Sequence, residues 1–195
     1  LRQEIVNRLP KFGQDDPDIA AFAERVLACV GRSAQGMVNG HGGRYECSLF
    51  SFYSYAALGD RTGATPDGRR AGTPLSEGIS PVQGADRSGP TSVIKSAGKM
   101  DHIRTGGTLL NMKFAPSLVE GEQGISKMAS LVRSYFRMDG HHVQFNVVRA
   151  DTLRAAQADP DAHRDLIVRV AGYSDYFCDL SRELQDEIIT RTEHD

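Results

Sequence analysis

Two segments of the chain, residues 108–115 and 141–148, alternate apolar and polar side chains, and a helical segment lies between them. Alternation with a period of two residues is the pattern of a β-strand with one apolar and one polar face. Strands separated by helices favour an α/β fold with parallel strands, because a parallel pair needs a long crossover connection. Residues 91–97 form a further candidate strand. The chain is therefore predicted to be an α/β protein.

The polar faces of the two alternating segments are unusual for surface strands. Asn111 and Lys113 lie on the first, and His142, Gln144 and Asn146 lie on the second. A strand with amides and an imidazole on one side either faces water or lines a polar interior. Both interpretations remain open from the sequence.

Helical patterns cover residues 16–31, 122–137, 151–157 and 181–192. In the first of these, Asp16 can cap the helix, Pro17 suits its first turn and Gly31 can end it. Cys29 lies beside the apolar face of that helix, so we expect a core residue rather than a reactive thiol. That apolar face comprises Ile19, Phe22, Ala23, Val26 and Val30.

Residues 36–90 are dense in glycine and proline, which indicates a long, irregular but ordered connection. A structureless segment of that length is uncommon in a compact domain, so we expect it to pack over a larger body or to line a site. Residues 36–43 are rich in glycine but lack the spacing and the preceding strand of a dinucleotide site. We therefore predict an ordered loop there, with no bound cofactor.

The composition argues against two classes of partner. The 195 residues carry 23 Lys and Arg against 25 Asp and Glu, a net charge of −2, so no overall field attracts nucleic acid or anionic lipid. Without an apolar run long enough to span a bilayer or a signal-peptide pattern, we expect a cytoplasmic protein. The three cysteines are expected to be reduced thiols. Because the chain begins with Leu1 in a helical pattern, we interpret it as a fragment.

The common catalytic motifs are missing from the sequence. It contains no GxSxG, HExxH, GxxxxGK[ST] or CxxC pattern, which weakens hydrolase, zinc and nucleotide interpretations. His141 and His142 are neighbours on a predicted strand, so they point to opposite faces and do not share a metal. Cys47 could be a nucleophile beside Glu46, although neighbours on a strand diverge, and Cys178 is interpreted as a small apolar residue. No metal site is predicted.

Gly172 interrupts an apolar run over residues 165–177. Taken alone, that run predicts a buried strand that turns at the glycine. Glycine inside a strand lowers stability and often marks a bulge or a close approach of the backbone. The position therefore calls for an explanation beyond packing.

Several segments together resemble the glycyl radical enzymes of the pyruvate formate-lyase and glycerol dehydratase type. The most specific are RVAGYS at residues 169–174 and LQDEIITRT at residues 184–192. Residues 109–114 (LLNMKF) and 142–148 (HVQFNVV) resemble two barrel strands of that family. Residues 67–91 resemble a long family loop, and residues 11–17 resemble the entry to a helix. The resemblance covers nearly the whole chain.

The resemblance implies that Gly172 stores an unpaired electron after a partner enzyme removes a Cα hydrogen. That activating enzyme contains an iron–sulfur cluster and uses S-adenosylmethionine; no cofactor bound to this chain is implied. A Cα radical is stabilised by the flanking amide nitrogen and carbonyl, and only glycine lets the centre flatten without a clashing side chain. Because oxygen destroys the radical, we expect a dry interior around the loop, built by Val168, Val170 and Phe177. The radical loop itself would comprise Arg169, Val170, Ala171, Gly172, Tyr173 and Ser174.

The implied fold is the second half of an α/β barrel with a C-terminal glycyl radical loop. We expect residues 1–64 to be a helical and loop segment of the barrel body, residues 65–150 to carry barrel strands, helices and the long loop, and residues 151–195 to form the glycyl radical domain. The family passes its radical to an upstream cysteine, which forms the thiyl that attacks the substrate. That loop is absent, and neither Cys47 nor Cys178 takes its role. This chain alone should be inactive.

The implied activity is that of an oxygen-sensitive, anaerobic lyase or dehydratase that cleaves a C–O, C–N or C–C bond of a small polar substrate. The implied partners are the activating enzyme, the remainder of the same enzyme and a second copy in a homo-oligomer. Formate C-acetyltransferase activity is the nearest alternative. A stand-alone radical-domain subunit for a split or damaged enzyme, and an inactive structural domain, are the other two.

Overall fold

The computed structural model describes residues 1–191 and 193–194, and it has the α/β fold predicted from the sequence. A parallel sheet with the strand order β2-β1-β5 lies at its centre. The strands are β1 (Leu110–Phe114), β2 (Val143–Val147) and β5 (Glu193–His194). The register pairs Asn111 with Gln144 and Lys113 with Asn146, so the predicted polar positions lie side by side on one face.

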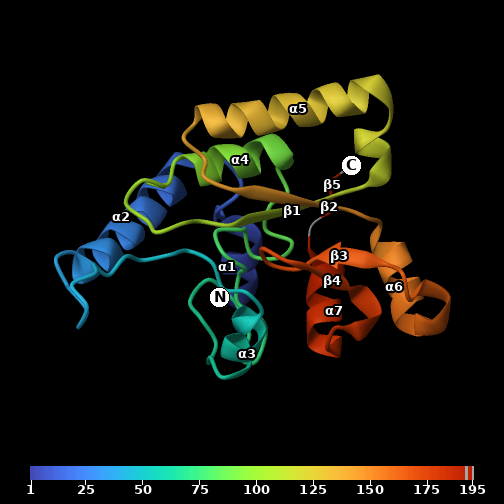
Figure 1. The fold of residues 1–195 in the computed structure, drawn as a ribbon, viewed down its shortest axis with the longest axis horizontal. Coiled ribbons are helices and arrows are strands. Elements are labelled where there is room, and N and C mark those ends of the chain that lie inside the picture. The colour runs from blue at the N-terminus through green and yellow to red at the C-terminus, as the bar shows by residue number, and fades with distance from the viewer. Residues whose placement is uncertain (192, 195) are drawn as a thin grey trace.

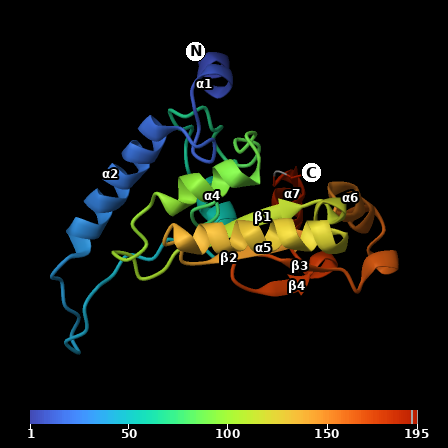
Figure 2. The same cartoon turned by 90° about the horizontal axis from the view of Figure 1, so that it is seen from above.

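Helices cover the apolar face of this sheet, and a small hairpin domain covers the polar face (Figures 1 and 2). The two strands of the hairpin, β3 (Ile167–Arg169) and β4 (Ser174–Tyr176), pair antiparallel. The helices are α1 (Arg2–Arg8), α2 (Pro17–Ala34), α3 (Ser54–Asp60), α4 (Pro90–Gly98), α5 (Gly121–Arg137), α6 (Ala150–Ala158) and α7 (Arg182–Thr190). Short 3-10 helices lie at Pro116–Val119, Pro160–His163 and Phe177–Asp179.

Two separate apolar cores follow from this arrangement. On one side of the sheet, Leu110, Met112 and Phe114 of β1 pack with α4 and with Tyr135 of α5. The other core joins α6, the hairpin, the third 3-10 helix and α7. Its buried members are Val148, Leu153, Ala156, Val168, Val170, Ala171, Phe177, Leu180, Ile188 and Ile189. The hairpin therefore belongs to a core of its own and rests on the sheet through the polar face.

The candidate strand at residues 91–97 is wrong, because this segment is helix α4. Gly89 has a φ of +84° and Pro90 occupies the first turn, a start typical of helices. Val93, Ile94 and Ala97 are buried together, and their spacing places them on one helical face toward α5. The β-branched residues of the run suggested a strand, but tertiary packing determines a helix.

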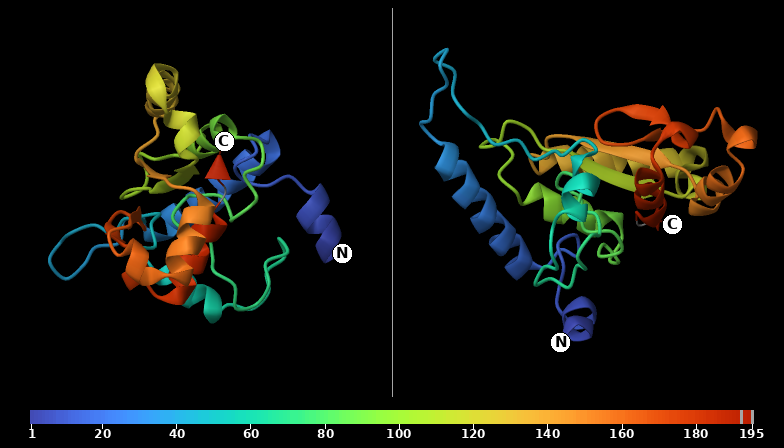
Figure 3. Two further views of the ribbon diagram at one scale, coloured as in Figure 1. Left: turned by 90° about the vertical axis from the view of Figure 1, so that its right-hand side faces the viewer. Right: turned by 90° about the horizontal axis from the view of Figure 1, so that it is seen from below.

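Helix α2 begins as predicted and ends later than predicted. The carboxylate of Asp16 accepts hydrogen bonds from the backbone N–H groups of Asp18 and Ile19, both at 3.0 Å. The helix continues past Gly31 to Ala34. The prediction that Cys29 is a core residue is wrong: its side chain is exposed, because no described segment packs on that face of α2. The helix projects away from the body (Figure 3).

Residues 36–90 form the expected ordered connection, with helix α3 as its regular element. Leu49 forms a parallel bridge to Thr108, and the N–H of Ile79 donates to the carbonyl of Leu109 at 2.9 Å. The connection thus runs beside the start of β1 and brings Glu77 to the polar face of the sheet, where Asn111 binds it. None of the described helices combines the length and apolar character needed to cross a membrane.

Candidate functional site

Gly172 lies at the tip of the β3–β4 hairpin. Arg169 pairs with Ser174 at the end of the ladder, and the Val170 N–H donates to the Tyr173 carbonyl at 2.9 Å to close the loop. Gly172 has a φ of +81°, a left-handed conformation that glycine adopts at little cost. A Cβ at this position would lie 3.2 Å from Cδ1 of Leu109. Both the turn and the neighbouring side chain therefore favour glycine.

The base of the hairpin is buried, as expected, but its tip is not. Val168, Val170, Ala171 and Phe177 are buried in the second core. In this chain Gly172 is exposed and Tyr173 is half-buried. The expected dry interior is therefore present beneath the hairpin and not around Gly172, because no described residue covers the tip.

Gln144 of β2 binds the tip directly. Its Oε1 accepts hydrogen bonds from the backbone N–H of Gly172 and from Nε of Arg169, each at 3.1 Å. Arg169 also donates from Nη1 to the hydroxyl of Ser174 at 3.1 Å. The glycine N–H, the arginine and the serine are thus held around one buried amide.

Asn146, two residues further along β2, binds the hairpin at Arg169, three residues before Gly172. Its Oδ1 accepts from the Arg169 N–H, and its Nδ2 donates to the Arg169 carbonyl, both at 2.7 Å. The amide of Asn146 thus donates to and accepts from the backbone of one residue, as a residue on a neighbouring antiparallel strand would. The polar face of β2 therefore lines a buried polar interior, which resolves the alternative left open by the sequence.

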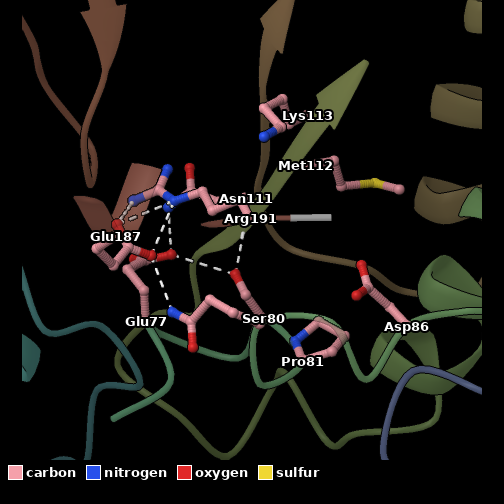
Figure 4. Close-up of a pocket in the computed structure, with 10 residues that line it drawn as sticks. Glu77, Ser80, Pro81, Asp86, Asn111, Met112, Lys113, Glu187 and Arg191 are labelled. Atoms are coloured by element: carbon pink, nitrogen blue, oxygen red, sulfur yellow. Dashed lines mark hydrogen bonds and ion pairs between the residues drawn. The ribbon is translucent and has the colours of Figure 1, made fainter. Parts of the chain in front are cut away.

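Asn111 of β1 continues the network inward. Its Nδ2 donates to the Val170 carbonyl at 3.2 Å and also to Oε2 of Glu77, while its Oδ1 accepts from Nε2 of Gln144. The hydroxyl of Ser80 donates to the same Glu77 oxygen at 3.1 Å. Of these residues, Glu77, Ser80 and Asn111 line a small pocket, together with Lys113, Glu187 and Arg191 (Figure 4).

An ion pair at the C-terminal end of α7 holds the hairpin from the other side, between Glu187 of the helix and Arg191, the residue that follows it. Arg191 donates from Nη2 to the Val170 carbonyl at 3.0 Å and from Nη1 to the Arg169 carbonyl at 3.3 Å. The same guanidinium pairs with Glu187 at 2.8 Å, and both side chains are buried. Glu187 in turn accepts from the Tyr55 hydroxyl at 2.7 Å. Helices α3 and α7 are thereby tied to the backbone of the hairpin.

Two ionisable groups beneath the hairpin have shifted pKa values. Burial raises the pKa of Glu77 to about 7, against the opposing effect of the positive charge of Arg191. Burial lowers the pKa of Lys113 to about 8, and its Nζ donates to the Ile189 carbonyl at 2.9 Å. Both groups lie close to a change of charge near neutral pH.

The predicted loop residues Arg169, Val170, Ala171, Tyr173 and Ser174 all lie in this hairpin. Glu77 and Tyr55 were not predicted as site residues, and Glu187 and Arg191 were included only in the resembling segment 184–192. The amides on the alternating strands were a usable signal for Asn111, Gln144 and Asn146. Glu77 gave no signal, because it lies in an irregular loop whose position depends on tertiary contacts. Thr192, at the end of the second resembling motif, lies outside the described residues.

The other singled-out residues lie elsewhere. The Cys178 thiol is half-buried and donates to the His163 carbonyl at 3.3 Å, and burial raises its pKa. Cys47 lies 3.7 Å from the Val30 carbonyl. His141 Nδ1 accepts from the Thr108 N–H at 3.3 Å. Within residues 1–191 and 193–194, no group of three or more His, Cys, Asp or Glu side chains is placed to hold a metal ion.

A protein-family model described as "Glycine radical" matches residues 75–178, more than half of the chain and including the hairpin tip. The chain belongs to the glycine radical family. A trans-4-hydroxy-L-proline dehydratase of Clostridioides difficile is 51% identical over 189 residues, which cover 97% of this chain and 24% of that protein. An indoleacetate decarboxylase of Tractidigestivibacter scatoligenes is 42% identical over 196 residues, covering 100% of this chain and 22% of the relative.

The solved structures agree with this family. The glycerol-bound B12-independent glycerol dehydratase from Clostridium butyricum has a TM-score of 0.96 to this chain at 44% identity. The alignment covers 99% of this chain and 25% of that structure. The chain thus spans about a quarter of the length of the relatives that it matches.

Proposed function

We propose that Gly172 is the radical-storing residue of a glycyl radical enzyme. The observation that carries this proposal is the position of Gly172 at an exposed hairpin tip, inside the region matched by the family model. Its two Cα hydrogens are not screened by a side chain of its own. In activation, one Cα–H bond breaks and the hydrogen atom passes to a radical on the activating partner, so the unpaired electron remains on Cα. Conjugation with the adjoining amides then stabilises it.

The whole enzyme would use this stored radical on a small polar substrate, as a dehydratase or another lyase. The names of the relatives support this class, because they include a hydroxyproline dehydratase and a glycerol dehydratase. A cysteine outside this chain would give its thiol hydrogen atom to Cα of Gly172 and become the thiyl that attacks the substrate. This chain would then supply the storage site, within a glycyl radical domain over residues 151–195.

The partners follow from the same proposal. They are an activating enzyme with an iron–sulfur cluster and S-adenosylmethionine, and the remaining part of the barrel, in a cytoplasmic homo-oligomer. The exposed tip supports an approach by the activating enzyme, since residues 172–176 are partly or fully accessible. The base of the hairpin is packed in the second core and supports the tip from below.

Electron paramagnetic resonance of the full enzyme after anaerobic activation tests the radical. We expect a doublet whose splitting changes when the protein is grown on glycine labelled with carbon-13 at Cα. Exposure to air should then cut the backbone at Gly172 and release a fragment that begins near Tyr173. Mass spectrometry identifies the cut, and a doublet followed by cleavage at another glycine would refute the assignment.

Gly172→Ala should abolish the doublet, and Gly36→Ala is the matched control. Gly36 has a φ of +82°, nearly that of Gly172, and open space around its Cα. The two substitutions therefore impose the same backbone strain. A normal doublet in Gly36→Ala and none in Gly172→Ala would separate the chemistry of the residue from the strain of its turn.

A further inference from the structure

A chain of hydrogen-bonded side chains connects a buried carboxyl group with the backbone N–H of Gly172. Glu77 accepts from Asn111, Asn111 accepts from Gln144, and Gln144 accepts from Gly172. The three side chains, which we call the amide relay, come from the long connection, β1 and β2. All three are buried, with exposed fractions of 2%, 8% and 6%. The strand register places Asn111 directly beside Gln144.

The direction of the relay is determined at its tip. The Gly172 N–H and Nε of Arg169 can only donate, so Gln144 must turn its carbonyl oxygen toward them. The amino group of Gln144 then faces Asn111, which must offer its oxygen in return. The amino group of Asn111 consequently faces the opposite way.

The other end of the relay requires the same direction. The amino group of Asn111 meets two acceptors, Oε2 of Glu77 and the Val170 carbonyl. A rotated Asn111 amide would turn its oxygen toward the Val170 carbonyl and toward Oε2 of Glu77, which already accepts from the Ser80 hydroxyl. Because each amide has its donor and its acceptor on opposite sides, the carboxylate orients both amides in sequence. A buried amide with the wrong orientation would leave several polar groups unpaired.

We propose that Glu77 is a positioning residue. Through Asn111 and Gln144 it keeps the hairpin tip bound to β2, and it thereby sets how readily Gly172 is released to an activating partner. The first part concerns the fold alone, and the second part rests on the proposed function. Glu77 has no hydrogen bond to Gly172, and the two amides connect them.

Hydrogen–deuterium exchange of the unactivated protein, read at single-residue resolution, tests the first part. Gln144→Leu removes the acceptor, and we expect the Gly172 amide to exchange about tenfold faster or more, the effect of losing one buried hydrogen bond. Asn146→Leu is the matched control on the same strand. It should speed exchange at Arg169, whose N–H it binds, and leave Gly172 within about twofold of the wild type.

A rescue experiment separates the direction of the relay from simple packing. Asn111→Asp keeps the shape of the side chain but turns an acceptor toward Glu77 and the Val170 carbonyl, so exchange at Gly172 should rise. Adding Glu77→Gln supplies an amide that can donate to the new carboxylate, so the double variant should recover most of the protection. Cooperative thermal unfolding of the single and the double variant shows that both are folded. Failure of the double variant to recover, or no effect of Gln144→Leu, would overturn the relay.

Activation of the full enzyme tests the second part. The doublet should grow faster in Asn111→Asp than in the wild type and return toward the wild-type rate in the double variant. If the doublet grows at the same rate in the wild type, in Asn111→Asp and in the double variant, while amide exchange at Gly172 changes as expected, the relay does not control release. No doublet in the wild type would refute the proposed function and the link to activation, while the exchange result would stand by itself.

Discussion

At the scale of single residues, Gly172 combines two requirements that are independent of each other. The left-handed backbone, with a φ of +81°, is a demand of the turn. The absence of a side chain on a radical centre would be a demand of the chemistry. Replacing Gly172 by any other residue affects both requirements at once. The free-energy cost of the strained turn must therefore be measured separately from the loss of the radical.

We expect Gly172→Ala to lower the free energy of unfolding by about 1–2 kcal/mol, the cost of a left-handed alanine, with a small addition from the 3.2 Å contact to Leu109. Gly36→Ala should cost nearly the same strain, because its φ is +82° and its surroundings are open. Urea denaturation of both variants measures the difference. A loss several times larger in Gly172→Ala alone would mean that the hairpin has no room for a methyl group.

Glu77 should make the stability depend on pH in a direction unlike that of most carboxylates. Its pKa rises from 4.5 to about 7 on folding, so the folded protein binds the extra proton. The stabilising contribution is complete below pH 4.5 and is lost as pH rises through about 7. Relative to Glu77→Gln, the wild type should lose about 3 kcal/mol across this window. Denaturation at several pH values tests this, and a difference that is flat or rises with pH would contradict it.

At the scale of elements, α7 is both a wall of the second core and an anchor for the hairpin. At its C-terminal end, Glu187 pairs with the buried Arg191, which donates to the carbonyls of Arg169 and Val170. The same helix carries an exposed pair with the same spacing, Arg182 and Asp186, at 3.5 Å. The two pairs allow the contribution of a buried ion pair to stability to be compared with that of an exposed one at the same spacing.

We expect Arg191→Met to destabilise the protein by about 3–5 kcal/mol, because it leaves the buried carboxylate of Glu187 without its cationic partner. Arg182→Met should cost less than about 1 kcal/mol, since exposed pairs contribute little. Adding Glu187→Gln to Arg191→Met should recover part of the loss. Thermal or chemical denaturation gives all three values, and equal effects of the two arginine substitutions would contradict the proposed anchor.

The regular elements show how far the sequence alone could lead. Strands β1 and β2 were predictable because alternating residues expose two faces. Asp16 was a predictable cap, and its carboxylate accepts from the N–H groups of Asp18 and Ile19. Helix α4 was missed because its β-branched run suits either structure until α5 covers it. Gly172 was singled out by its place in an apolar run. Glu77 was not, because its role depends on contacts far away in sequence.

At the scale of the whole molecule, the described chain has a compact side and an open side. The hairpin, α6 and α7 enclose a core, whereas α2 projects outward and exposes Phe22, Val26 and Val30 at 60%, 49% and 49% (Figure 3). A contiguous apolar face of this kind exceeds the scattered apolar residues of an ordinary surface.

The 195-residue chain by itself should therefore bind an apolar dye and self-associate. Val26→Glu with Val30→Glu should lower dye binding and shift the chain toward monomer in sedimentation, because the charges interrupt the apolar face. Ile125→Glu is the control, since Ile125 is 64% exposed and lies on a different helix, α5. Equal effects of the two changes, or a wild-type chain that is monomeric without bound dye, would contradict this expectation.

The hairpin has one further property that follows from its connection to the sheet. Among the described strands, β3 pairs only with β4, while β1 and β2 pair with each other. Pulling a strand from a sheet breaks a whole row of backbone bonds together. Moving the tip away from the sheet would instead break single hydrogen bonds between sheet side chains and the hairpin backbone. Water would replace each of them, at a net cost of about 0.5–1.5 kcal/mol per bond. Because Val168, Val170 and Ala171 are buried in the second core, a displacement of this kind would be confined to the exposed tip, and β1 and β2 would keep their alignment.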